Sequence, residues 1–255
     1  MNILVTNDDG IEAAGLQALV KELKKVGKVY VCAPNTQRSC SSISLSIHSS
    51  LQFEKRDFDP EVEAYALYGT PADCARMGLL CLFKNVKFDI VVSGINHGFN
   101  GGNDILYSGT VGAAREAFMD GVVAMAVSVN SFKRTDFTFA AEVGRECVEK
   151  FVSDPHNREF VLNVNVPDCE REQCLGYKAC DIQGTRVYDE GYFVEEIDGK
   201  TFVSHKQNII TDVNDPNDLN VDTMAIKQNY ITVSAVGIEA LDHRFKEHLT
   251  QNYQK

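Results

Sequence analysis

Two carboxylates stand side by side near the start of the chain, in the segment Thr6-Asn7-Asp8-Asp9-Gly10. The apolar residues Ile3–Val5 before them are typical of a buried strand. Like charges at adjacent positions repel each other, and a divalent cation between them would relieve that repulsion. Hard cations such as Mg²⁺ or Mn²⁺ take oxygen ligands and commonly bind through only one or two carboxylates. The pair therefore indicates a metal site. The alternative is a helix N-cap followed by a first-turn acid.

Two further polar segments follow predicted strands, so the fold would bring them to the same edge of a sheet as Asp8 and Asp9. Asn35–Ser39 contains Arg38 and Ser39. Arg38 either pairs with a phosphate or stays solvated. Ser93–Gly102 contains Asn96 and runs on to Tyr107–Thr110. Asn and Ser oxygens are neutral ligands, so they can complete the shell of a cation without adding charge.

The third segment is dense in glycine and leads directly into a predicted helix that starts near Val111. Glycines let backbone amides approach an anion closely, and a helix N-terminus after Ser108-Gly109-Thr110 offers free amides to a phosphate. The alternative is a flexible loop with a Ser/Thr cap. The pattern matches neither the Walker A motif nor the Gly-x-Gly-x-x-Gly fingerprint of dinucleotide sites.

Other reactive side chains are weaker candidates. His97 is either a ligand or acid/base group, or a loop histidine with no such role. Cys74 is a poor nucleophile because no histidine lies near it in sequence to lower the pKa of its thiol. Its segment, Gly69–Cys74, is typical of a helix start.

Short apolar strands alternate with amphipathic helices through the first two-thirds of the chain, which predicts an α/β fold. The fold class is a Rossmann-like, doubly wound, mostly parallel sheet in a three-layer αβα arrangement, with ligands outside the carboxyl ends of the strands. Residues 1–167 form the predicted core. Residues 168–255 form a C-terminal β-hairpin extension with a last strand, Tyr230–Val236, and a polar helix, as part of the same structural unit. The predicted elements of the core are strands at 3–5, 29–33, 51–68 (a pair), 89–93, 122–129 and 160–166, and helices at 16–26, 71–84, 111–119 and 137–151.

Composition and charge exclude several classes of protein. The net charge of −11, without a Lys/Arg run, argues against nucleic-acid binding. The eight cysteines include no Cys-x-x-Cys pair, so free thiols are favoured over a zinc cluster. No signal peptide and no apolar run long enough to span a membrane are present. We expect a soluble, cytoplasmic protein with a small phosphate-bearing ligand.

Several of these segments together resemble the SurE (survival protein E) family of metal-dependent nucleotide phosphatases. The resemblance covers roughly residues 2–130 in the family's order, with Asn163–Pro167 extending it. The matching stretches are Ile3–Gly10, Ala33-Pro34 with Arg38-Ser39, Gly69–Cys74, Val92–Asn100, and Tyr107–Ala114.

The resemblance implies one divalent cation per subunit, Mg²⁺ or Mn²⁺, held by Asp8, Asp9, Ser39 and Asn96. It also implies hydrolysis of nucleoside monophosphates at the 5′ and often the 3′ position, with activity on short polyphosphate in some members. Homodimers or homotetramers with exchanged C-terminal elements are implied as well. Two departures stand out: Cys40 replaces a usual glycine beside Ser39, and Val233–Gly237 replaces the family's usual ending.

The sequence therefore predicts a metal-dependent phosphomonoesterase acting on nucleotides. Asp9 or Asp8 would be the general base for a metal-bound water, and a covalent aspartyl-phosphate route stays open with the same residues. Asn96, Ser108, Gly109 and Thr110 would stabilise charge on the phosphoryl group. A catalytically weak nucleotide-binding regulator is the alternative, supported by Cys40, and a phosphotransferase would need an acceptor site that the sequence does not reveal. Further site candidates are Asn7, Arg38, Gly94, His97 and Asn100.

Overall fold

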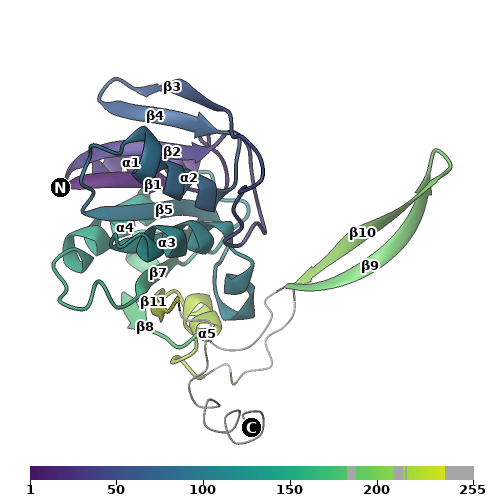
Figure 1. The fold of residues 1–255 in the computed structure, drawn as a ribbon. Coiled ribbons are helices and arrows are strands. Elements are labelled where there is room, and N and C mark those ends of the chain that lie inside the picture. The colour runs from purple at the N-terminus through teal and green to yellow at the C-terminus, as the bar shows by residue number, and fades with distance from the viewer. Residues whose placement is uncertain (183–187, 210–214, 216, 239–255) are drawn as a thin grey trace, which may run out of the picture.

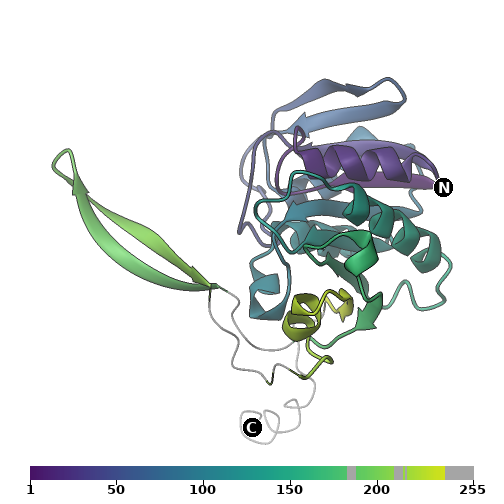
Figure 2. The same ribbon diagram turned by 180° about the vertical axis from the view of Figure 1, so that it is seen from behind.

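The protein is a layered α/β domain from which one long hairpin projects (Figures 1 and 2). This computed structural model describes all residues except 183–187, 210–214, 216 and 239–255. Within the described residues, none of the helices has the length and apolar character that a membrane span requires.

A nine-stranded sheet forms the middle layer of the described chain, in the order β3-β4-β2-β1-β5-β6-β7-β11-β8. The strands from β4 to β7 in that order run parallel, and β3 and β11 pair antiparallel with their neighbours β4 and β7. Every residue of β6 is buried, as expected for a strand covered on both faces. The strands are β1 (Asn2–Thr6), β2 (Lys28–Pro34), β3 (Phe53–Asp59), β4 (Val62–Leu67), β5 (Ile90–His97), β6 (Ala124–Val129), β7 (Val161–Val166), β8 (Tyr177–Ala179) and β11 (Ile231–Val236).

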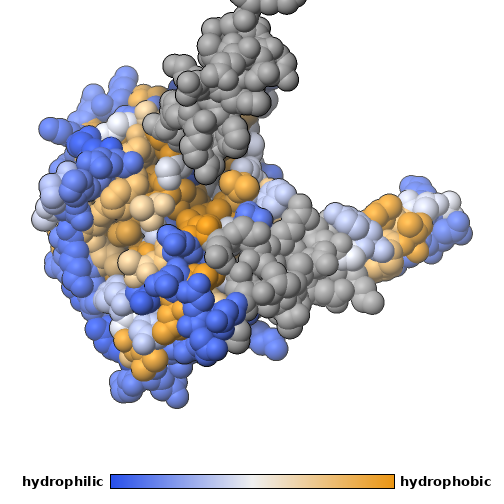
Figure 3. All heavy atoms as spheres, turned by 90° about the horizontal axis from the view of Figure 1, so that it is seen from below, coloured by the Kyte–Doolittle hydropathy of each residue, from blue (hydrophilic) through white to orange (hydrophobic). Residues whose placement is uncertain are grey.

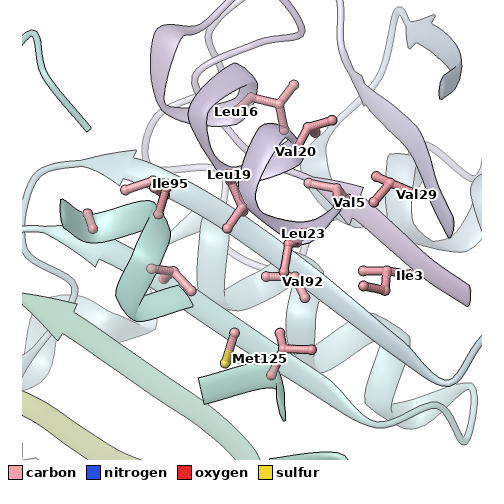
Figure 4. Close-up of a cluster of buried hydrophobic side chains, with 14 of the residues drawn as sticks. Ile3, Val5, Leu16, Leu19, Val20, Leu23, Val29, Val92, Ile95 and Met125 are labelled. Carbon is pink, nitrogen blue, oxygen red and sulfur yellow. The ribbon is translucent and has the colours of Figure 1, made fainter. Parts of the chain in front are cut away.

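Helices cover both faces of this sheet, which confirms the predicted doubly wound α/β fold. On one face, α1 (Ala14–Leu23) and α4 (Thr138–Phe151) bury a large apolar cluster. Leu16, Leu19 and Val20 of α1 pack there near Val5 and Met125 of the sheet (Figure 4). On the other face lie α2 (Pro71–Met77), the π-helical turn η1 (Gly78–Leu82) and α3 (Gly109–Met119), while η2 (Gly102–Leu106), η3 (Arg171–Gln173) and α5 (Asp222–Lys227) are short.

Three element boundaries differ from the prediction by more than two residues. The first helix ends at Leu23 in a series of turns, ahead of Gly27. The helix from Pro71 gives way at Gly78 to a π-turn. A Cβ at Gly78 would lie only 2.9 Å from Leu4 Cδ2, so glycine lets the chain pass close to the sheet there. The strand expected to stop at Ser93 continues to His97, with its register to β6 shifted between Ser93 and Asn96.

The C-terminal part both projects from the sheet and returns to it. β9 (Tyr188–Ile197) and β10 (Lys200–Ile209) form the predicted hairpin, closed by a turn in which Asp198 and Gly199 both have positive φ. Its described side chains include exposed hydrophobic ones, such as Val194 and Val203. Figure 3 shows hydrophobic residues, in orange, on the projecting arm. β8, α5 and β11, by contrast, lie with the main sheet. The division at residue 167 stays a prediction, and the expected C-terminal helix lies largely outside the described residues.

Candidate metal and phosphate site

The three polar segments meet at the carboxyl edge of the sheet because β1 lies between β2 and β5. β1 pairs in parallel with both neighbours, so the turn after Thr6 lies beside the end of β5 and beside the segment that follows Pro34. In the turn itself, Asn7 Nδ2 donates to Gly10 O at 2.9 Å, and Gly10 N donates back to Asn7 Oδ1 at 3.2 Å. Asn7 therefore closes the turn that presents the two carboxylates.

Asp8 is 5% exposed and contacts the first turn of α3. The Thr110 hydroxyl donates to Asp8 Oδ1 at 2.5 Å, and Arg38 N donates to Asp8 O at 2.7 Å. Burial raises the pKa of Asp8 to about 7; the Thr110 hydrogen bond opposes that rise and the neighbouring charge of Asp9 adds to it. Without a cation, Asp8 is thus a carboxylate that is costly to ionise.

Asp9 is half-buried and is held by two donors. His97 N donates to Asp9 Oδ2 at 3.0 Å, and Gln37 Nε2 donates to Asp9 Oδ1 at 3.2 Å. Burial raises the pKa of this carboxyl too, while the hydrogen bonds from His97 and Gln37 lower it. These contacts join the segments after β1, β2 and β5 into one site.

Ser39 lies in an exposed segment whose flanking residues contact Asp8. Arg38 bonds Asp8 through its backbone, and Ser41 Oγ lies 2.5 Å from the point where a Gly109 Cβ would be. That same point is 2.9 Å from Asp8 Cβ, so Asp8, Ser41 and the start of α3 are packed together. Between Ser39 and Ser41, Cys40 has φ +57°, the left-handed backbone that suits glycine.

The segment continues to the start of α2, which explains the Gly69–Cys74 motif. Thr70 and Asp73 form a capping box at that helix start. The same two side chains also hold the segment from Ser39: Thr70 Oγ1 donates to Ser44 O at 2.6 Å, and Ser46 Oγ donates to Asp73 Oδ2 at 2.7 Å. The motif is therefore a helix start that also anchors the loop beside Asp8.

The residues expected to bind phosphate stand at the start of α3. Ser108 is the N-cap, and its Oγ accepts from Val111 N at 3.1 Å, which leaves the hydroxyl proton available to a ligand. Gly109 leaves no room for a side chain beside Asp8. Thr110 is fully buried; its hydroxyl donates to Asp8, and its backbone N–H also lowers the pKa of Asp8, so both donors of Thr110 are directed at that carboxylate.

The candidates on β5, Asn96, Gly94 and His97, differ in what their side chains contact. Asn96 is half-buried, and its Nδ2 donates to Gly98 O at 2.8 Å. Gly94 has φ +145° and a Cβ there would collide with Val127 O, so Gly94 shapes the strand. The His97 ring packs edge-on against Phe137, with the ring centroids 5.2 Å apart. Its backbone N–H bonds Asp9, and the charge of its side chain also lowers the pKa of Asp9.

The side chains of two candidates, Asn100 and Arg38, bond residues other than Asp8 and Asp9. Asn100 is 7% exposed and bonds residues of β6 and β7. The exposed Arg38 guanidinium lies 3.5 Å from Asn35 Oδ1. Both stay predictions as ligand-binding residues.

The donor set fits a hard cation. No lysine or arginine of the described residues forms an ion pair with Asp8 or Asp9. No three His, Cys, Asp or Glu side chains in the described part of the chain are grouped to hold a metal, so a cation here needs neutral oxygens such as those of Ser39 and Asn96. Burial raises the pKa of the Cys74 thiol, which keeps it protonated and unreactive.

Sequence reasoning did not single out three residues that contact the predicted site residues: Gln37 bonds Asp9, Ser41 packs at Gly109, and Asn165 bonds Asn100. Gln37 and Ser41 lie in the predicted polar segment or just after it, but nothing in their spacing distinguishes them from solvated loop residues. Asn165 carried a signal, because Asn163-Val-Asn165-Val alternates polar and apolar residues on a strand that is buried on both faces.

The chain is similar to known proteins over nearly its whole length. A family model described as "Survival protein SurE" matches residues 3–190. "5′-nucleotidase SurE" of Clostridium botulinum (strain 657 / Type Ba4) is 37% identical over 255 residues, covering 98% of each chain. The Thermosipho africanus (strain TCF52B) protein of the same description is 36% identical, covering 100% of this chain and 98% of its own. The crystal structure of the SurE protein from Aquifex aeolicus superposes with a TM-score of 0.83 at 30% identity, covering 99% of both chains.

Proposed function

Because the chain belongs to the SurE family, we propose that it is a 5′-nucleotidase whose activity depends on one Mg²⁺ or Mn²⁺ held at Asp8 and Asp9. The family membership supports the nucleotidase activity. The desolvated carboxylate pair, with no cationic side chain paired to it among the described residues, carries the proposal of a metal. Ser39 and Asn96 would supply the neutral oxygens of the shell.

The chain's own residues then divide the work of hydrolysis. When bound, the cation would polarise a phosphoryl oxygen and lower the pKa of a water molecule. The amide of Gly109 and the Ser108 hydroxyl would bind the other phosphoryl oxygens at the positive end of the α3 dipole. Thr110 would keep Asp8 in place through the 2.5 Å hydrogen bond.

Asp9 is the proposed acceptor for the proton of the attacking water. Burial raises the pKa of Asp9 above that of an exposed carboxyl, and a carboxylate near a metal-bound water can accept its proton. Its two hydrogen bonds, from His97 N and Gln37 Nε2, fix its orientation and leave lone pairs on both oxygens. Attack by Asp8 or Asp9 on phosphorus is the competing route, and an acid-stable phosphoenzyme detected by rapid quench would establish it.

Three further properties extend the proposal. A site whose proposed contacts are all to the phosphoryl group would also accept 3′-nucleotides and short polyphosphate, because these substrates carry the same group. The exposed Phe193, Val194, Phe202 and Val203 of the hairpin support exchange of this arm between subunits of a dimer or tetramer. The scattered cysteines support a reducing, cytoplasmic location.

Phosphate release is the direct test of the activity. AMP, GMP, CMP, UMP, 3′-AMP and tripolyphosphate would each be incubated with the protein in Mn²⁺, Mg²⁺ or EDTA. We expect release from 5′-nucleotides in the presence of metal and none in EDTA. If phosphate release in EDTA equals that in Mn²⁺ or Mg²⁺, the activity does not depend on a metal and that part of the proposal is wrong.

The alternative, a nucleotide-binding regulator, is favoured by one observation, the left-handed Cys40 beside Ser39. Metal-dependent binding of AMP with no phosphate release from any substrate of the panel would establish it. Restoration of release by Cys40→Gly would then identify Cys40 as the cause.

A further inference from the structure

Polar side chains replace apolar ones on the sheet beneath the glycine-rich loop. Asn163 and Asn165 of β7 alternate with Val164, which belongs to the cluster on the α1 and α4 face, so the asparagines face the α3 side. Ser128 of β6 is paired in register with Asn165. All three polar side chains are at most 1% exposed. A buried amide is costly unless it is hydrogen-bonded, so the partners of these side chains indicate their role.

Their partner is a single loop residue, Asn100. Asn163 Nδ2 and Asn165 Nδ2 both donate to Asn100 O, at 2.8 and 3.0 Å. Asn100 N donates to Asn165 Oδ1 at 2.9 Å, and Asn100 Nδ2 donates to Ser128 Oγ at 2.7 Å. Both backbone groups of Asn100 and its side-chain amide are thus fixed to the sheet.

The loop is also fixed on either side of Asn100. Gly98 N donates to Val129 O at 3.0 Å, and Gly102 N donates to Asp222 Oδ2 of α5 at 2.9 Å. Gly98 in turn carries the carbonyl that accepts from Asn96 Nδ2 at 2.8 Å. With Nδ2 used in this way, Oδ1 is the end of the Asn96 amide left for a cation.

We propose that Asn165, with Asn163 and Ser128, positions Asn96 as a cation ligand by clamping the loop at Asn100. The inference rests on the proposed metal site. It means that β7, which is distant in sequence from Asp8 and Asp9, contributes to the affinity of that site for the cation. Partners in the second shell of a metal site set the orientation of its ligands, and their removal typically lowers metal affinity about 10- to 100-fold.

Direct Mn²⁺ binding tests this without relying on turnover. The full chain would be titrated with Mn²⁺ and free Mn²⁺ measured by electron paramagnetic resonance, with Tm recorded in EDTA. Asn165→Leu, close to isosteric, should raise the Kd for Mn²⁺ at least about tenfold. Thr232→Val is the matched control: Thr232 pairs in register with Asn165, is 1% exposed, and its hydroxyl bonds no described residue, so the Kd should stay within about twofold.

A milder variant keeps the test decisive if Asn165→Leu does not fold. Ser128→Ala removes one hydrogen bond to Asn100 and should raise the Kd for Mn²⁺ about threefold. If folded Asn165→Leu and Ser128→Ala bind Mn²⁺ with the wild-type Kd, whether or not Tm is lowered, the positioning role is overturned and the proposed function stays intact. A wild-type protein that binds no Mn²⁺ would instead overturn the metal site and this inference together.

Discussion

Replacing Asp8 by asparagine should stabilise the metal-free protein in a pH-dependent way. Burial raises the pKa of Asp8 from 3.8 to about 7. A carboxyl that binds its proton more tightly when folded contributes stability that is complete below pH 3.8 and is lost as the pH rises to about 7. At about 1.4 kcal/mol per pH unit, ionised Asp8 lowers the free energy of unfolding by about 4 kcal/mol above pH 7.

Asparagine carries no charge and can still accept the Thr110 hydrogen bond. In EDTA at pH 8, Asp8→Asn should therefore be up to about 4 kcal/mol more stable than the wild type, and the difference should narrow to about 2 kcal/mol at pH 5. Urea unfolding followed by circular dichroism measures both values. Saturating Mn²⁺ should stabilise the wild type by mass action and leave the variant unchanged, reducing or reversing the difference.

Asp57→Asn is the matched control, because it makes the same change of charge at an exposed position of β3. Its free energy of unfolding should stay within about 0.5 kcal/mol of the wild type. If Asp8→Asn is no more stable than the wild type at pH 8 in EDTA, the account of Asp8 as a desolvated, metal-requiring carboxylate is refuted.

Three other variants test separate parts of the account. Cys40→Gly should raise the free energy of unfolding by about 1 kcal/mol, because glycine adopts φ +57° without strain; an unchanged urea midpoint would contradict this. Gly109→Ala should lower the rate of phosphate release roughly 100-fold, since its methyl group would displace Asp8 or Ser41; near-normal release would show that this packing does not matter. Phe202→Glu should shift the oligomer toward smaller species in sedimentation velocity, whereas an unchanged distribution would exclude the exposed arm from assembly.

The core was predictable because its signals are local. Leu16, Leu19 and Val20 recur at helical spacing and pack on the sheet as expected. Parallel strands bring their carboxyl ends to one edge, so Asp8 and the end of β5 could be placed at the same edge from the predicted parallel sheet; that β1 and β5 are direct neighbours is seen only in the structure.

The details of the site depend on long-range contacts that no local pattern encodes. Thr110 was predicted as a phosphate-binding residue, and nothing local to it shows that its hydroxyl donates to Asp8, 102 residues earlier in the chain. The alternation of Asn163 and Asn165 predicts a strand, yet it does not reveal that Asn100 is their shared partner. β5 continues past Ser93 through Gly94, which has a positive φ. From sequence alone, a glycine at this position predicts the start of a loop.

The central claim is that Asp8 and Asp9 hold the cation on which phosphate release depends. The most direct measurement is a Mn²⁺ titration of the full chain in which bound Mn²⁺ and phosphate release from AMP are followed together, for the wild type and Asp9→Asn. We predict one Mn²⁺ per chain, release that rises in proportion to bound Mn²⁺, and loss of both in Asp9→Asn. Wild-type Mn²⁺ binding and turnover in Asp9→Asn would contradict the account.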